Sequence, residues 1–266
     1  LSALGITLTL FSIPWITNSA VMFFIYLAQA LMFSTFNISL NAQAVAFQKK
    51  LGRVVLGTLH GAWSVGAALT TTFTGWLMSF ALDFKIQMII VPVFCLIVFQ
   101  IAGSRLLTHE EEKGGTEAKP GKKVSWLKSP TYLWLLAIGL FAGMWPELVV
   151  MDWSALFVRK IYGDSYTSLA GVPYAILGAA MVIGRFSIGA LTKRWHLATL
   201  AKWGGIFGSI AMGIGVLGSL VPGGFVIQCI FFGLAGFGLA PQVPSSYSAA
   251  GNVRGLSTAQ ALSRIS

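Results

Sequence analysis

Long apolar runs separated by short polar turns dominate the pattern of this chain. Residues 1–48 and residues 203–253 contain no Asp, Glu, Lys or Arg. A helix rises about 1.5 Å per residue, so either stretch would be roughly 70–75 Å long as one rod, whereas a bilayer core is about 30 Å thick. Each stretch must therefore fold back once and supply two membrane spans.

The apolar runs predict helices rather than membrane strands. A membrane strand alternates apolar and polar residues over about 10 positions, whereas residues 88–91 and 229–232 are apolar without a break. Helices pair every backbone N–H and C=O within the lipid. We therefore expect an all-α polytopic membrane protein of about eight spans, at residues 1–18, 20–47, 54–80, 85–104, 129–157, 166–192, 200–220 and 224–250.

A long polar segment divides the predicted spans into two sets of four. Residues 105–128 carry three consecutive glutamates and several lysines and glycines, which is typical of a flexible linker. We expect part of one helical bundle in residues 1–104, the linker in 105–128, and part of a second bundle in 129–266. Both chain ends are abrupt. If the linker is the centre of a two-fold repeated protein, as in many secondary transporters, equal numbers of spans are missing from the two sides.

Charge is scarce in this chain and lies mostly between the spans. Charged residues make up 10% of the chain and hydrophobic residues 56%, whereas soluble domains carry about 25% charged residues. Of the 18 Lys and Arg residues, 14 fall on the side that includes the linker and 3 on the other. The positive-inside rule places the linker in the cytoplasm. The net charge of +10 therefore indicates topology in a bacterial-type cytoplasmic membrane, not nucleic-acid binding.

Four stretches resemble the major facilitator superfamily, and within it the MosC/YbjJ-like branch, which is related to fucose-type sugar permeases. No single stretch is decisive, but their order along most of the chain is fairly specific. They are Asn41–Val45, His60–Gly66, Glu147 with Asp152–Leu156, and Gly184-Arg185 with Gly189 and Lys193-Arg194.

The resemblance implies twelve helices in two bundles, with a cytoplasmic loop after the sixth. The chain would then cover helices three to ten, and helices one, two, eleven and twelve would be absent. Members of the superfamily use helix one for substrate and coupling contacts, which this chain could not supply. The related sugar permeases carry an acidic residue in the helix that corresponds to residues 20–47, where this sequence has none. That departure leaves Glu147 as the better proton-binding candidate.

Glu147 is the main candidate for chemistry because it lies near the middle of the predicted span 129–157, directly after Pro146. A carboxylate at that depth costs about 3 kcal/mol to insert and marks a functional site by default. It either binds a proton or substrate, or is a structural carboxylate bonded to a neighbouring helix. Trp145 could stack on a sugar-like ring or simply pack in the bilayer. Asp152, about 140° around the helix from Glu147, is expected at a helix end or gate.

Three other polar side chains within spans are candidates for substrate or proton binding. Asn37 and Asn41 are four residues apart and share a helix face, where amides pair across helices or line a cavity. His60 could take part in proton coupling, although a lone histidine in a helix is more often a packing residue.

Arg185 alone among the basic residues falls inside a predicted span. It lies about seven residues, or roughly 10 Å, from the cytoplasmic end of its helix, so its side chain is expected to snorkel to that surface. The family resemblance implies a gating or structural role for Arg185, Gly184 and Gly189 rather than substrate contact.

These features favour a secondary active transporter of a small solute, sugar-like or drug-like, working by alternating access. Proton coupling through Glu147 is the narrower prediction. A non-transporting receptor or scaffold on a transporter fold is the alternative, and scattered histidines with one deep acid argue against a polytopic enzyme. We expect the lipid bilayer, a small-molecule substrate and protons as partners, no cofactor or metal, no nucleic acid, and a monomer.

Overall fold

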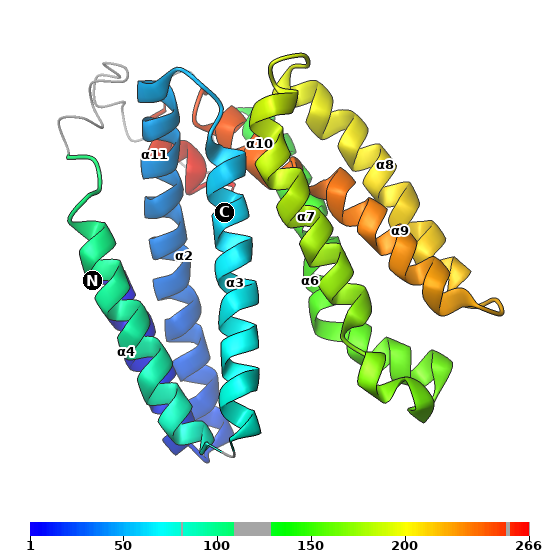
Figure 1. Cartoon of the computed structure of the whole chain (residues 1–266). Coiled ribbons are helices and arrows are strands. Elements are labelled where there is room, and N and C mark those ends of the chain that lie inside the picture. Colours follow the sequence, from blue (N-terminus) through cyan, green and yellow to red (C-terminus); the bar gives the residue numbers. More distant parts are fainter. Residues whose placement is uncertain (81, 109–128, 254–255, 266) are drawn as a thin grey trace.

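The computed structural model describes residues 1–80, 82–108, 129–253 and 256–265, apart from the side chains at positions 71–72, 74–76 and 78–79. Within these residues every regular element is a helix (Figure 1), which confirms the predicted all-α fold class. The predicted linker lies outside the described residues from position 109 to 128. The elements are α1 (Ser2–Ser12), η1 (Ile13–Trp15), α2 (Ser19–Leu51), α3 (Leu56–Ser79), α4 (Phe84–Gly103), α6 (Thr131–Tyr162), η3 (Asp164–Leu169), α7 (Val172–Leu191), α8 (Leu197–Gly218), α9 (Gly224–Leu239), α10 (Gln242–Ala250) and α11 (Thr258–Leu262).

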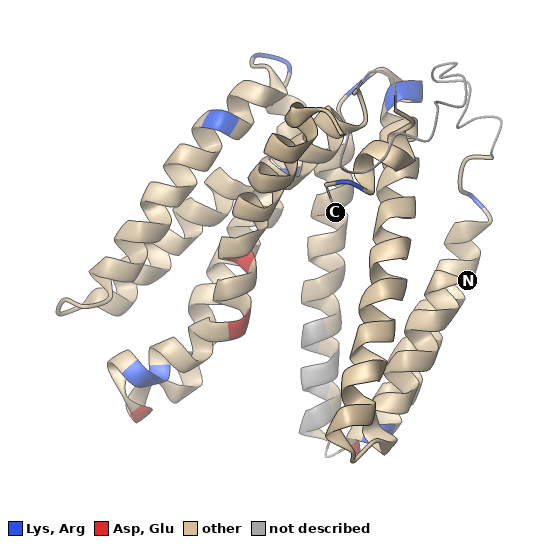
Figure 2. Cartoon of the chain, turned by 180° about the vertical axis from the view of Figure 1, so that it is seen from behind, with Lys and Arg blue, Asp and Glu red and all other residues tan. Residues whose placement is uncertain are grey.

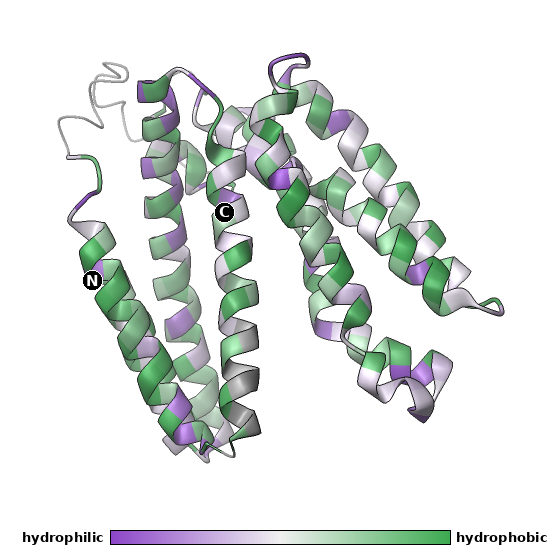
Figure 3. Cartoon of the chain, in the orientation of Figure 1, coloured by the Kyte–Doolittle hydropathy of each residue, from purple (hydrophilic) through white to green (hydrophobic). Residues whose placement is uncertain are grey.

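Most of these helices have the length and hydropathy of membrane spans. In the described part of the chain, six stretches are long and apolar enough to cross a bilayer: Ser19–Leu51, Phe84–Gly103, Thr131–Tyr162, Asp164–Leu191, Leu197–Gly218 and Gly224–Ala250. The segment Ser2–Trp15 is apolar but shorter, and α3 is 24 residues long. Figure 3 shows hydrophobic residues along the length of the helices and hydrophilic ones gathered mainly at their ends.

Local sequence signals account for the ends of several helices. The Asn18 side chain caps α2 by accepting hydrogen bonds from the backbone N–H groups of Ala20 and Val21, at 2.9 and 3.2 Å. The same helix ends at Gly52, whose φ of 62° lies in the left-handed region that glycine adopts without strain. Asp83 caps α4 through the backbone N–H of Lys85 at 2.6 Å. These caps satisfy backbone groups that a helix end leaves unpaired.

The last predicted span, 224–250, is two helices rather than one. The chain breaks between α9 and α10 at Pro241, which has no backbone N–H to donate into the helix and whose ring crowds the preceding turn. Helical hydrogen bonding begins again at Ser245, whose backbone N–H donates to the carbonyl of Pro241 at 3.0 Å. The break lets α10 pack against α6, α8, α3 and α2, whereas α9 packs mainly between α7 and α8.

The helices form two sets that meet at one end. Helices α1 to α4 lie together, and α6 to α10 lie together, with α3 against α7 and α10 against α2 and α3 as the connections between them. In Figures 1 and 2 the two sets approach each other near the C-terminal end of α2, and they lie farther apart at the opposite end.

Two glycines of α3 allow the close approach to α7. A Cβ atom on Gly57 would lie 2.8 Å from the backbone oxygen of Arg185 and from the Ile188 side chain, and one on Gly61 would lie 3.0 Å from the Phe186 ring. The contact at Gly57 is with backbone and too short for any Cβ without displacement, whereas at Gly61 the Phe186 ring would have to shift slightly. Beyond this region the contact ends, because residues 65–70 of α3 are all exposed.

A hydrophobic cluster closes the end where the two sets meet. It joins Val45 of α2 and Leu56 of α3 to Leu140 of α6, Tyr247 of α10 and Leu262 of α11, all of them at most 3% exposed. Because helices from both sets contribute to one packed cluster, this end cannot open without exposing all of these side chains.

We predict that Gly57→Ala destabilises the protein by about 1–3 kcal/mol because the added methyl group overpacks the α3–α7 contact. Thermal unfolding of the purified protein in detergent measures the effect as a lower midpoint. The matched control is Gly213→Ala in α8, where a Cβ would meet nothing within 4 Å. An equal response of the two variants would show that the α3–α7 approach is not tight.

Candidate functional site

The candidate site is an ion pair between two helices of the second set. Arg185 of α7 donates from Nη2 to Oε2 of Glu147 in α6 at 2.9 Å, and the side chains of the two residues are 3% and 17% exposed. Pairing and hydrogen bonding are what make a charge tolerable at such depth. Glu147 is the member of the pair that remains partly accessible.

Arg185 also connects this pair to the first set of helices. Its Nη1 donates to the Ser64 hydroxyl of α3, and that hydroxyl donates to the backbone oxygen of His60 at 3.1 Å. The ring of Trp63, also in α3, lies 5.9 Å from the guanidinium carbon, within range of a cation–π contact. One arginine therefore holds α6, α7 and α3 together.

The expectation that Arg185 snorkels to the surface is wrong. Its side chain turns into the protein, where the residue is 2% exposed, because a carboxylate and a hydroxyl are available there. Snorkelling is the solution for an arginine without an internal partner.

A fourth helix closes the site through aromatic stacking. The His60 ring lies 5.8 Å from the ring of Tyr247 in α10, with an angle of 11° between the planes. Two buried polar atoms of the cluster have no hydrogen-bond partner among the described residues, namely Nε2 of His60 and Nε of Arg185. Such unsatisfied atoms are uncommon in folded proteins and call for an explanation.

Helical spacing explains why Glu147 faces this cluster. Gly143, Val150 and Ser154, which lie four residues before and three and seven after it, are all buried on the same stripe of α6. The helix continues through Pro146 as one element. A carboxylate on the buried stripe is therefore directed at α7, whose own buried stripe includes Gly184, Arg185 and Ile188.

The remaining sequence candidates lie outside this cluster. Trp145 is exposed and packs on Phe141, with ring centroids 5.1 Å apart. Asp152 is exposed on another face of α6. Asn41 donates to the backbone oxygen of Asn37 at 2.9 Å and to its side-chain oxygen. The two asparagines thus bond to each other within α2, whereas their shared face predicted pairing across helices or the lining of a cavity.

The two glycines named with Arg185 serve different contacts. A Cβ on Gly184 would lie 2.6 Å from the Cβ of Ala240, so this glycine allows α7 to approach α9. A Cβ on Gly189 would lie 3.7 Å from the Val54 oxygen, which is ordinary contact distance.

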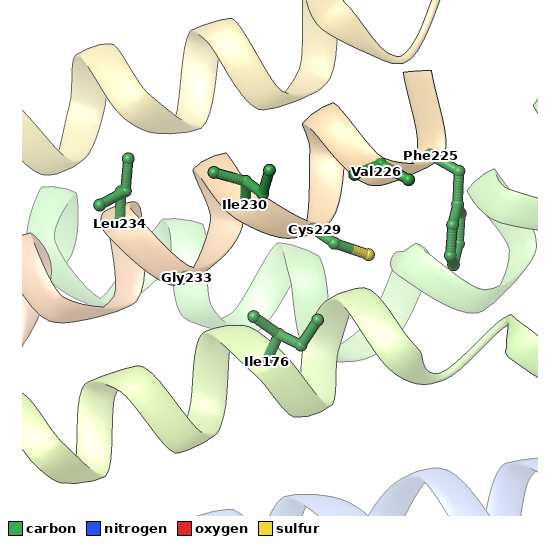
Figure 4. Close-up of a pocket in the computed structure, with 7 residues that line it drawn as sticks. All are labelled: Ile176, Phe225, Val226, Cys229, Ile230, Gly233 and Leu234. Atoms are coloured by element: carbon green, nitrogen blue, oxygen red, sulfur yellow. The ribbon is translucent and has the colours of Figure 1, made fainter. Parts of the chain in front are cut away.

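Two grooves lie away from the ion pair. The first, with a volume of about 440 Å³, runs between α7 and α9 and is apolar, the Cys229 thiol being its most polar group (Figure 4). The second, of about 420 Å³, lies where η3 meets the turn between α8 and α9, beside Tyr162, Tyr166 and Phe225. Neither groove includes Glu147 or Arg185, and the residues that the structure describes contain no cluster of His, Cys, Asp and Glu suited to a metal ion.

Sequence reasoning singled out Glu147, Arg185 and His60 but did not connect them. Their pairing could have been predicted, because ionisable residues within membrane spans pair with one another. Arg185 was the one basic residue placed inside a span. Tyr247 was missed altogether, since nothing in the sequence links a tyrosine of residues 224–250 to a histidine of residues 54–80.

Comparison with known proteins identifies the family of this chain. A profile of the Major Facilitator Superfamily matches residues 1–264. The chain belongs to this superfamily. It is therefore a multi-pass integral membrane protein of a transporter family, as its helices also indicate.

Two bacterial relatives are similar to the chain over most of its length. An uncharacterized MFS-type transporter of Yersinia pestis is 27% identical over 219 residues, which are 81% of this chain and 53% of the relative. An uncharacterized transporter of Sinorhizobium fredii is 26% identical over 248 residues, which are 89% of this chain and 59% of the relative. The chain thus spans little more than half the length of these superfamily members. No solved structure shows a significant match.

We predict that Arg185→Met destabilises the protein by about 3 kcal/mol because it leaves the Glu147 carboxylate without its partner. The double variant Arg185→Met/Glu147→Gln should recover most of that loss, since neither side chain then carries a charge. Thermal unfolding in detergent measures both. If the double variant is no more stable than Arg185→Met, the ion pair is not what holds the cluster.

Proposed function

We propose that this chain forms the central part of a secondary active transporter that works by alternating access between its two sets of helices. In this proposal residues 1–104 and 129–266 are the two bundles, and the four family-like stretches support placement in the MosC/YbjJ-like branch. The observation that carries the proposal is the Arg185–Glu147 pair, because it lies within membrane-spanning helices and is tied through Ser64 to the opposite set.

The direction in which the structure is open follows from the loop charges. Lysines and arginines concentrate on the side of the linker, at the C-terminal end of α2 and between α7 and α8 (Figure 2). The positive-inside rule puts this side in the cytoplasm, and the bacterial relatives support a cytoplasmic membrane. The packed end is then the cytoplasmic one, and the protein is closed to the cytoplasm.

Polar contacts reinforce that closed end. The ammonium group of Lys49 in α2 donates to the backbone oxygen of Gly251 at 2.6 Å, directly after α10. Gln48 donates to the Ser248 hydroxyl of α10 at 3.0 Å. We call these two contacts the cytoplasmic latch. An inward-open state requires that the latch break together with the hydrophobic cluster around it.

Glu147 is assigned the role of the proton-binding residue. It lies at membrane depth, keeps 17% of its side chain accessible, and its charge is balanced by a single arginine. A proton on this carboxylate weakens the contact with Arg185 and so weakens the link from α6 through Arg185 to α3. Proton binding can thereby bias the movement of one set of helices against the other.

We predict that Glu147→Gln abolishes the proton dependence of transport. A screen of sugars, polyols and drugs for thermal stabilisation identifies a solute, whose uptake by proteoliposomes is then measured at several pH values with and without a proton gradient. Asp152→Asn is the control, since it removes an acid of the same helix outside the cluster. Unchanged proton dependence in Glu147→Gln would exclude the role assigned to this residue.

We predict that weakening the cytoplasmic latch opens the closed end. Lys49→Met should increase the labelling of a cysteine introduced at Ala250, which is 0% exposed, by a membrane-impermeant maleimide in inside-out vesicles, with Cys95 and Cys229 replaced by serine. The increase should be at least about threefold, corresponding to the loss of one charge-assisted hydrogen bond shared among several contacts. Lys193→Met removes a charge at the same end without touching the latch. Equal labelling in the two variants would contradict the assignment of Lys49 to the closed state.

A further inference from the structure

We propose that the solute carried by this protein is a small carboxylate, bound by Arg185 in place of Glu147 and carried together with a proton. This inference rests on the transporter function proposed above and adds the chemical class of the substrate. It follows from how the charges of the ion-pair cluster must balance.

The first step concerns what protonation of Glu147 leaves behind. Arg185 is 2% exposed, and among the described residues Glu147 is the carboxylate that pairs with it, at 2.9 Å. Once Glu147 carries a proton, the guanidinium charge is buried without a counter-ion, which costs several kcal/mol. Another negative charge that takes the place of Glu147 at Arg185 avoids this cost.

The second step is that no other side chain near the pair, among the described residues, supplies that charge. The titratable groups around the pair are Tyr174 of α7, His60 of α3, Tyr247 of α10 and Asp152 of α6 itself. Histidine adds positive charge when it titrates, and the two phenols are neutral at ordinary pH. Asp152 is exposed on another face of α6. We therefore propose that a bound anion supplies the counter-charge.

The third step is the geometry of the guanidinium. Nε and Nη2 form one edge of the arginine side chain, and a carboxylate can accept from both of them in a two-pronged contact. Glu147 uses Nη2 alone, at 2.9 Å, and Nε has no hydrogen-bond partner in the part of the chain that the structure describes. A ligand carboxylate at this edge would satisfy the unpaired Nε as well as replace the charge of Glu147.

The fourth step is access. Glu147 is the more exposed member of the pair, and Trp63 beside the guanidinium is 57% exposed. The ligand is proposed to reach the pair from the Glu147 side once that carboxyl is protonated and released. Arrival of one negative charge with one proton leaves the net charge of the cluster unchanged, so that the two binding events favour each other equally.

Matched pairs of solutes test the inference, each pair differing mainly in a carboxylate. The pairs are glucuronate and glucose, lactate and propane-1,2-diol, and benzoate and benzyl alcohol. Binding to the complete purified protein is measured by calorimetry in weakly buffered solution with a pH indicator. At least one carboxylate should bind roughly tenfold or more tightly than its neutral partner, with uptake of about one proton per bound anion.

Variants separate the roles of the two charges. Glu147→Gln should bind the carboxylate without proton uptake, because its side chain is already neutral. Arg185→Gln should lose the preference for the carboxylate over its neutral partner, and Asp152→Asn should behave like the unaltered protein. Arg185→Gln leaves the buried Glu147 without its partner and can therefore fail to fold. The double variant Arg185→Gln/Glu147→Gln removes both charges, and it should likewise show no preference for the carboxylate over its neutral partner.

Several results would overturn the inference. Equal binding of carboxylates and neutral partners, binding of neutral solutes alone, binding of none of the six, or anion binding without proton uptake would each do so. Transport of a neutral solute that depends on protons and fails in Glu147→Gln would overturn the substrate class while leaving the transporter proposal intact. Carboxylate binding without transport in proteoliposomes would instead contradict the transporter proposal and leave the site standing.

Discussion

A buried charge must keep a partner, and this constraint organises the centre of the molecule. Arg185 lies within a membrane-spanning helix at 2% exposure, so the positions of α6 and α3 are tied to it by Glu147 and Ser64. Moving either helix away from α7 would strip a hydrogen-bonded partner from a desolvated guanidinium, at a cost of several kcal/mol. The cluster thus couples the two sets of helices more strongly than the area of their contact suggests.

The packing around the cluster makes this coupling geometrically possible. Lipid tails are as apolar as helix surfaces, so helices in a membrane associate through close packing and polar contacts. Gly57 and Gly61 bring α3 near enough to α7 for Ser64 to reach Arg185. Past Ser64, residues 65–70 of α3 are exposed, and the cluster lies at the boundary between the packed end and the separated end. Because the Arg185–Glu147 pair lies at that boundary, a change in the protonation of Glu147 would affect the contacts at both ends.

The fold was predictable because it depends on hydropathy, which can be read directly from the sequence. Charge-free runs and polar turns located the long helices. The sequence did not predict the interruption at Pro241, the break between η3 and α7 within the predicted span 166–192, or the short helix α11. The site was less predictable because it depends on pairs of residues distant in sequence. Asn37 and Asn41, whose shared face predicted pairing across helices or the lining of a cavity, bond to each other within α2. Arg185 and Glu147 are 38 residues apart and on different helices, so their spacing did not indicate their pairing. The prediction of snorkelling used only the distance of Arg185 from the helix end, whereas the conformation of its side chain depends on its partner.

Stability alone does not explain why an ion pair occupies this position. A buried salt bridge gains little net free energy, since desolvation offsets attraction, and well-packed apolar side chains of similar volume are often equally or more stabilising. The pair also leaves Nε of Arg185 and Nε2 of His60 unsatisfied, which is a further cost in the observed state. A purely structural cluster would gain from replacing these groups by leucine or methionine. An exchangeable counter-ion at Arg185 accounts for the same features, because the unpaired donor and the accessible carboxylate are then what binding of a proton and an anion requires.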